Sequence, residues 1–120
     1  MGKRIAGTCY MKIDGVQVSI KGSIEVALSK TKRESLDSLS GPTGFFKETA
    51  ITPYVKGAFH VPPDFPREKL MTSTDLTITT EFANGWVHTL SGGYNVGEPT
   101  FKGEEGETEL QFDGVDGDFQ

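Results

Sequence analysis

Histidine and cysteine are the side chains with the widest chemistry in this sequence, and they are few. His60 and His88 lie in separate β-patterned segments, and neither has a histidine partner four residues away or a nearby cysteine. Zinc sites need three or four such ligands at short spacings. Cys9 is the single cysteine, so the chain forms no internal disulfide or thiolate cluster. We therefore expect no metal site, and we interpret Cys9 as a small buried side chain of a protein made in a reducing cytoplasm.

Catalytic motifs are also missing from the sequence. It has no GxSxG elbow, no phosphate-binding glycine loop and no HExxH pair. The acidic run at residues 104–109 lies in a glycine-rich turn, where two carboxylates cannot be buried and tuned as an acid–base pair. Its acidic residues also lack the order of a calcium-binding loop. We expect no catalytic residue and no cofactor, and we predict that the protein is not an enzyme.

Charge is divided unevenly along the chain. Residues 1–60 carry a net charge of +4 and residues 61–120 a net charge of −9. An acidic end of a chain is often only a solvated segment. It can also form a face that repels polyanions, or a face that meets a basic face of another copy. The 120 residues are expected to form one domain, 1–120, and no apolar run is long enough to span a membrane. The sequence therefore predicts no membrane insertion of its own.

The first third of the chain is patterned as β-strands. Residues 7–14 alternate and end at Asp14-Gly15, a strong hairpin turn signal. Apolar side chains then occupy alternate positions through residues 16–29: Val16, Val18, Ile20, Ile24, Val26 and Leu28. A single strand of thirteen residues would span about 40 Å, whereas a compact chain of this size is only about 30 Å across. We expect this ribbon to overhang its domain and to pair with identical copies in a closed barrel; Gly22 within it indicates a bulge or bend.

Residues 30–47 break the strand pattern. Lys30, Lys32 and Arg33 cluster there, and the exposed-looking pair Phe45 and Phe46 follows a stretch rich in Ser, Gly and Pro. A long irregular loop in a compact domain is usually functional or disordered. We predict a long inter-strand loop whose basic and aromatic residues contact another subunit, or whose aromatics pack back on their own core.

The rest of the chain predicts antiparallel β-structure with one short helix. Strands are expected at 48–61 (with an irregularity at Pro53), 75–83, 86–90, 94–96, 100–102 and 107–113, with turns at Asn84-Gly85 and 103–106. The helix follows Asp64, a candidate cap, with Pro66 in its first turn. Residues 114–120 look like a loose tail. The predicted fold class is mainly β, a sandwich or small barrel.

Four segments of the sequence resemble the tail tube proteins of Mu-type contractile-tailed phages. They are GTCYMKIDGVQVSIKGSIEVALS, GFFKETAITPYVKGAF, PREKLMTSTDLTITTEFANGWVHTL and GEEGETELQFDG. Together they extend over nearly the whole chain, and their order carries the resemblance, since no single motif is diagnostic. Residues 30–43 do not align with the family.

The resemblance implies a structural role in a virion tail. Six subunits would form a ring, and each would give four long strands to a 24-stranded inner barrel. Rings would stack into a tube that contacts sheath, baseplate and tape-measure proteins, is assembled in the host bacterial cytoplasm, and lets DNA pass without specific binding. Phage-tail-like bacteriocins and type VI secretion tubes belong to the wider group.

Within that architecture, we expect the polar face of residues 16–29 to face the lumen. Its members are small or mixed in sign and include no aromatic platform for nucleic acid: Gln17, Ser19, Lys21, Ser23 and Glu25. Lys21 is expected to pair with Glu25. The five contact residues of the 30–47 loop, named above, are expected to touch an adjacent ring. The alternative function is a small β-sandwich binding module for a glycan or protein ligand, with Trp86 and Tyr94 as an exposed aromatic patch.

Overall fold

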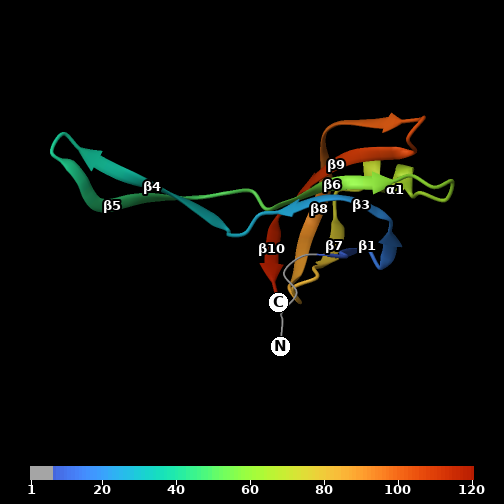
Figure 1. Ribbon diagram of the computed structural model, residues 1–120, viewed down its shortest axis with the longest axis horizontal. Helices are drawn as coiled ribbons and strands as arrows, with labels where there is room; N and C mark the ends of the chain where they lie inside the picture. Colours follow the sequence, from blue (N-terminus) through green and yellow to red (C-terminus); the bar gives the residue numbers. More distant parts are fainter. Residues whose placement is uncertain (1–6) are drawn as a thin grey trace.

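A computed structural model describes residues 7–120, and this part of the chain contains ten strands and one helix (Figure 1). In chain order they are β1 (Tyr10–Ile13), β2 (Val16–Val18), β3 (Ile20–Val26), β4 (Thr31–Ser38), β5 (Gly41–Ala50), β6 (Tyr54–His60), α1 (Arg67–Thr72), β7 (Leu76–Glu81), β8 (Val87–Lys102), β9 (Glu107–Asp113) and β10 (Asp116–Phe119). The mainly β fold with one short helix is confirmed. That helix is far too short and polar to cross a membrane, and residues 7–120 contain no longer apolar helix.

The body of the protein is one bent antiparallel sheet. Its strands lie in the order β2-β1-β7-β8-β9-β6-β3, and β10 also pairs with β8. The start of β8 pairs with β7 and β10, whereas its second part, from Tyr94, pairs with β9. We call β2, β1, β7, the start of β8 and β10 the first half-sheet, and the end of β8, β9, β6 and β3 the second half-sheet.

Both half-sheets contribute to one hydrophobic core. Met11, Ile78 and Leu90 come from the first half-sheet, and Phe59 and Phe112 from the second; all are at most 1% exposed. Helix α1 adds the buried Leu70. The two half-sheets therefore enclose the core between their inner faces, as in a sandwich.

The prediction of one long strand over residues 16–29 is wrong. The chain leaves the first half-sheet after Val18, passes Ser19, and joins the second half-sheet at Ile20, so that β2 pairs with β1 and β3 pairs with β6. The register of β3 shifts twice around Gly22, and Ser23 has φ +56°, which confirms the irregularity expected at Gly22. The alternation of apolar residues does not reveal where the chain crosses between the half-sheets, because the inward-facing residues are apolar both before and after the crossing.

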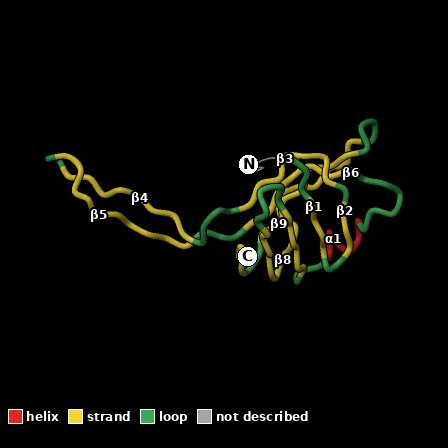
Figure 2. Tube along the Cα trace, turned by 60° about the horizontal axis from the view of Figure 1, so that its bottom comes forward, coloured by secondary structure: helices red, strands yellow, loops and turns green. Residues whose placement is uncertain are grey.

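The prediction of an irregular loop at residues 30–47 is also wrong. Strands β4 and β5 pair over Thr31↔Ala50 to Ser38↔Gly41 and form a hairpin, which we call the arm (residues 31–50). The arm projects from one end of the body in both views (Figures 1 and 2). It gives the chain a length of 60 Å and a radius of gyration of 17.4 Å, against about 14 Å for a compact chain of this size. An overhanging ribbon exists, but it is the arm and not residues 16–29.

The predicted tight turns are confirmed. Asp14 and Gly15 have φ values of +51° and +84°, as a type I′ turn requires, and join β1 to β2. The Asp14 carboxylate also accepts a hydrogen bond from the backbone N–H of Thr77 at 2.8 Å. Asn84 and Gly85 form the turn between β7 and β8.

Several smaller predictions are corrected. Pro53 does interrupt the expected strand 48–61, and only Tyr54–His60 joins the body. Helix α1 begins after Pro66 with no side-chain cap, so Asp64 does not cap it. The segments expected at 86–90, 94–96 and 100–102 are parts of one strand, β8.

The C-terminal end is not a loose tail. Residues 116–119 form β10, which continues along the edge of β8 where β9 ends, from Asp116↔Ser91 to Phe119↔His88. The backbone N–H of Val115 already bonds to the Ser91 carbonyl at 2.9 Å. Backbone pairing with an open strand edge holds this segment, and such pairing leaves no apolar pattern in the sequence.

His88 lies beneath β10. Its ring is 1% exposed, packs edge-on against the Phe119 ring at 4.9 Å between centroids, and has an Nδ1 atom without a hydrogen-bond partner among the described residues. Burial lowers the pKa of this imidazole, and the nearby Asp118 carboxylate opposes that shift to a smaller extent. The folded protein therefore holds His88 neutral under conditions where an unfolded chain protonates it.

We expect His88 to make stability fall with acidification. Below pH about 6.5 the unfolded chain binds a proton that the folded chain resists, so the free energy of unfolding decreases by at most about 1.4 kcal/mol per pH unit from this group. Urea unfolding at pH 7.0 and 5.0 measures the decrease. The decrease should shrink in His88→Leu and persist in His60→Gln, which removes an exposed histidine; equal decreases in wild type and His88→Leu would contradict the assignment.

Candidate assembly surfaces

The outer face of the second half-sheet is polar. Because Val55, Phe59 and Phe112 point into the core, their neighbours in β6 and β9 point outward. These outward residues meet in cross-strand pairs, which are Tyr54↔Asp113, Lys56↔Gln111, Ala58↔Glu109 and His60↔Glu107. In this 120-residue protein, the outer face of the second half-sheet is therefore hydrophilic, while the hydrophobic core lies against its inner face.

Ion pairs neutralise two of the lysines on this face. Lys21 of β3 pairs with Glu107 of β9, and Lys56 Nζ lies 3.4 Å from Glu25 Oε2. The Tyr54 hydroxyl donates a hydrogen bond to the same Glu25 oxygen at 2.7 Å. This hydrogen bond, with the Lys56 charge, lowers the pKa of Glu25, and the bond to Lys21 lowers the pKa of Glu107.

The predicted pair of Lys21 with Glu25 is therefore wrong. The two residues are four positions apart, about 13 Å along an extended strand, and each finds an opposite charge on another strand. The hydrogen bond from Lys21 to Glu107 raises the pKa of the lysine.

The structure places the five residues predicted to face a lumen in three different places. Lys21, Ser23 and Glu25 lie on β3 in the second half-sheet, whereas Gln17 lies on β2 in the first, and Ser19 occupies the crossing between them. All five are exposed. Of the apolar set, Val18 is buried and Ile20, Ile24 and Val26 pack against the core, but Val16 and Leu28 are 51% and 72% exposed.

The second half-sheet ends in two strands that have a partner on one side only. Among residues 7–120, β3 pairs with β6 alone, and β8 beyond Tyr94 pairs with β9 alone. Such edges present unpaired backbone N–H and C=O groups to any further strand. This surface can therefore extend by strand addition.

The arm has two exposed faces, each with apolar and charged side chains. Residues opposite each other in the register share a face, so Leu36 and Phe45 lie together on one face, while Phe46 lies on the other. Leu36, Phe45 and Phe46 are 48%, 73% and 53% exposed. The Arg33 guanidinium lies 4.8 Å from the centre of the Phe46 ring, at cation–π distance. The two predicted contact aromatics thus point in opposite directions.

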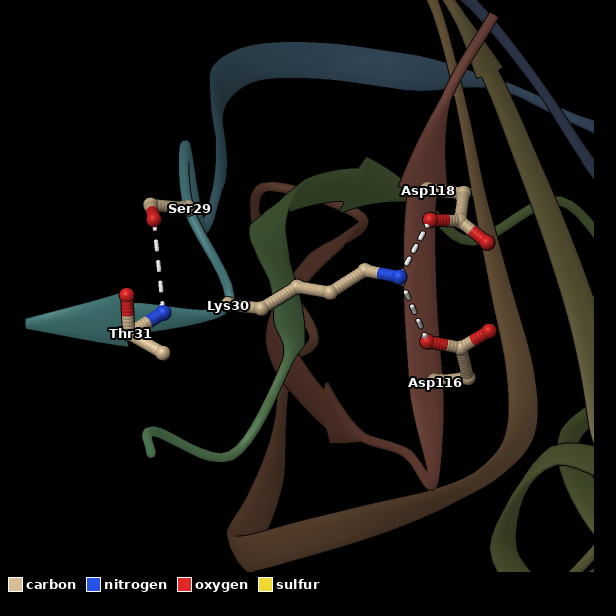
Figure 3. A network of polar contacts seen from close by, with 5 residues as sticks. All are labelled: Ser29, Lys30, Thr31, Asp116 and Asp118. Carbon is tan, nitrogen blue, oxygen red and sulfur yellow. Dashed lines mark hydrogen bonds and ion pairs between the residues drawn. The ribbon is translucent and has the colours of Figure 1, made fainter. Parts of the chain in front are cut away.

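Lys30 anchors the base of the arm to the C-terminal strand. Its Nζ lies 2.6 Å from Asp118 Oδ1 and 3.3 Å from Asp116 Oδ1, both on β10 (Figure 3). The backbone N–H of Thr31 donates to Ser29 Oγ at 3.3 Å in the same network. The two carboxylates raise the pKa of Lys30, and Lys30 lowers the pKa of Asp118. The sequence did not predict this anchor, because β10 carries no strand signal.

The two aromatic residues of the alternative function do not form one patch. Trp86 is 50% exposed and packs edge-on against Phe119 at 5.4 Å, next to the start of β8. Tyr94 lies eight residues further along the same chain segment, which corresponds to about 25 Å in an extended strand. Within residues 7–120, no three His, Cys, Asp or Glu side chains gather as a metal site.

Comparisons with known proteins point to one family. Residues 2–118 match the family model described as phage tail tube protein. In fold, the chain is similar to the anti-feeding prophage tube terminating cap (TM-score 0.66, 10% identity, 100% of this chain and 93% of that chain covered). It is also similar to chains from an extracellular contractile injection system, a PVC sheath/tube terminator (0.59, 9%, 93% and 92%) and a PVC sheath-tube complex (0.62, 8%, 99% and 91%). No curated protein matches the sequence.

Removal of the Lys30 side chain should loosen the arm without unfolding the body. In Lys30→Ala we expect faster amide exchange at Thr31 and Ile51, which flank the anchor, and an almost unchanged unfolding midpoint, because exposed ion pairs contribute little to global stability. Hydrogen exchange measured by NMR distinguishes the two effects. Lys32→Ala, which removes a lysine within the arm itself, is the matched control; the same change in exchange in both variants would argue against an anchor.

Proposed function

The chain belongs to the phage tail tube protein family, and from this premise we propose that six copies form a ring and that rings stack into the tube of a phage or phage-like contractile tail. DNA passes through the lumen of that tube without specific binding. The observation that carries the proposal is the second half-sheet, which has four strands, a polar outer face and two unpaired edges.

Strand direction supports closure of this half-sheet into a ring. Its four strands are antiparallel throughout, so the outer strands β8 and β3 run in opposite directions. The β3 edge of one copy therefore meets the β8 edge of the next as another antiparallel pair. Six copies then give a barrel of 24 strands, and a closed barrel removes the unpaired edges of a free subunit.

The charge of the outer face suits a passage for DNA. Lys21 and Lys56 are held by acidic partners, and Glu109 and Asp113 add further negative charge to the same face. Lys102 is a further exposed lysine of this face and lies opposite Glu107 in the register. A surface whose lysines lie beside carboxylates does not accumulate the phosphate contacts on which non-specific DNA affinity depends. Lys21, Ser23 and Glu25 of β3 face the lumen in this arrangement, with Gln17 and Ser19 beyond the end of β3.

The arm supplies contacts between rings. Its exposed aromatics and its basic residues Lys32 and Arg33 extend about 26 Å beyond the body, if eight strand residues rise 3.3 Å each. A two-stranded hairpin is marginally stable alone and is expected to gain order against another subunit. Sheath, baseplate and tape-measure proteins are the further partners, in a virion tail assembled in the host bacterial cytoplasm.

Replacement of the arm should abolish tube formation and leave the body folded. Because Thr31 and Ala50 are paired, an Asn-Gly turn can join them in place of residues 32–49. Negative-stain microscopy of wild type should show rings or tubes, and this variant should show no tubes but a core unfolding transition like that of wild type. Tubes from the shortened chain would refute the role of the arm, and only featureless monomers from wild type would refute the proposed function.

Replacement of an acidic residue of the proposed lumen with lysine should make the tube bind DNA. Glu109 is exposed on the outer face of the second half-sheet, so Glu109→Lys places six added lysines in each ring of the proposed barrel. We expect wild-type tubes to leave DNA mobility unchanged at 50 mM salt and the variant tubes to retard it, with binding lost steeply as salt rises. Glu68→Lys on α1 makes the same change of charge outside this face; equal retardation by both variants would contradict the lumen assignment.

A further inference from the structure

An apolar groove opens at the end of the body opposite the arm. Its volume is about 340 Å³, and it lies between the segment around α1 and the β8–β9 hairpin. Its lining includes Val61, Phe65 and Met71 on one side and Phe101 and Leu110 on the other. Phe101 is 61% exposed there. Figure 1 shows α1 and this hairpin at one end of the long axis and the arm at the other.

The arm carries an apolar face of matching character. Leu36 and Phe45 are cross-strand partners on one face of the arm, and Phe45 is 73% exposed. The arm points away from its own body, so these side chains do not reach the groove of the same chain. One exposed apolar face and one open apolar groove therefore lie at opposite ends of each subunit.

Charge around the two surfaces is complementary. The β8–β9 hairpin, residues 98–109, carries the exposed Glu98, Glu104 and Glu105 and one lysine, while its Glu107 and Glu109 point to the outer face of the sheet. Arg67 is the one charged residue in the lining of the groove itself. On the Leu36–Phe45 face, the cross-strand neighbours are Lys32, Glu34 and Lys47, so lysines outnumber acids there. An arm that enters the groove brings these lysines towards the acidic hairpin, which favours this orientation of approach.

We propose that the Leu36–Phe45 face of the arm of one copy docks in the groove between α1 and the β8–β9 hairpin of a second copy in the adjacent ring. The inference rests on the proposed function and names the acceptor site for the arm. Since donor and acceptor are different surfaces at opposite ends, the contact is heterologous and repeats without closing, as a stack of rings requires. Phe45 is the central anchor, because buried aromatic side chains dominate such contacts; Phe46 remains on the far face with Arg33.

Site-specific photo-crosslinking tests the docking in assembled tubes. Phe45 is replaced by p-benzoylphenylalanine, which keeps an aromatic ring, and mass spectrometry locates the crosslinked residues. We expect intermolecular links to residues 61–71 or 99–110, and no such links from the same probe at position 46, which lies on the opposite face. Links from position 45 to any other region, or equal links to the groove from both positions, would overturn the proposal.

If the probe prevents tube assembly, a pair of variants in the groove tests the docking instead. Met71 lines the groove and is only partly buried, so Met71→Glu places a charge in the acceptor site while Met71→Leu keeps it apolar. We expect the critical concentration for tube formation to rise about tenfold or more in Met71→Glu and to stay near the wild-type value in Met71→Leu. Both variants should retain the wild-type circular dichroism spectrum.

The outcomes distinguish this proposal from the function on which it rests. If wild-type protein forms tubes but Met71→Glu assembles as readily, the groove assignment is wrong and the tube function stands. If wild-type protein forms neither rings nor tubes, the tube function itself fails, and the groove proposal fails with it.

Discussion

The structure depends on how strand β8 satisfies its backbone hydrogen bonds. Over its first residues it pairs on both sides, with β7 and β10, and there it buries Leu90 and His88. From Tyr94 onward it pairs with β9 only, and its last six residues are exposed. One strand therefore has partners on both sides in the first half-sheet and on one side only in the second. The second half-sheet also has a polar outer face, so a further strand that pairs with this edge would have no apolar outer face to cover.

The hydrophobic core and the surfaces proposed for assembly lie in different parts of the molecule. The core residues from both half-sheets lie in the body, whereas nearly all side chains of the arm are exposed. A hairpin that buries so little contributes little to folding, so its sequence is free to be selected for contacts with other chains. Lys30 links the two parts, because it holds the base of the arm to β10, which in turn covers His88. The base of the arm is thus tied to the C-terminal strand.

The parts of the fold that were predictable from sequence are those with local chemical signals. The Asp14-Gly15 turn has positive φ at both residues and the Asn84-Gly85 turn has it at Gly85, conformations that Asp and Gly favour. Leu76 and Ile78 alternate because one face of β7 is buried. The arm was missed because a ribbon exposed on both faces has no apolar alternation, and Ser, Gly and Pro in residues 38–44 resemble a loop. Strand β10 was also missed, because backbone pairing with the edge of β8 holds it and such pairing needs no apolar pattern in the sequence. The crossing at Ser19 leaves no signal in the sequence, because Val18 in the first half-sheet and Ile20 in the second half-sheet both face the core.

The candidate surfaces were predicted as residue types but not as an arrangement. Exposure of Lys21, Ser23 and Glu25 follows from the alternation of β3, yet the ion-pair partners of Lys21 and Glu25 come from strands β9 and β6, more than thirty residues away in sequence. Likewise, Phe45 and Phe46 are both predicted as contact residues, but adjacent residues of a strand point to opposite faces. Two neighbouring aromatics in an extended arm therefore cannot enter one pocket together. An arm of this kind can hold one partner through Phe45 and still present Phe46, backed by Arg33, to a different neighbour in the same assembly.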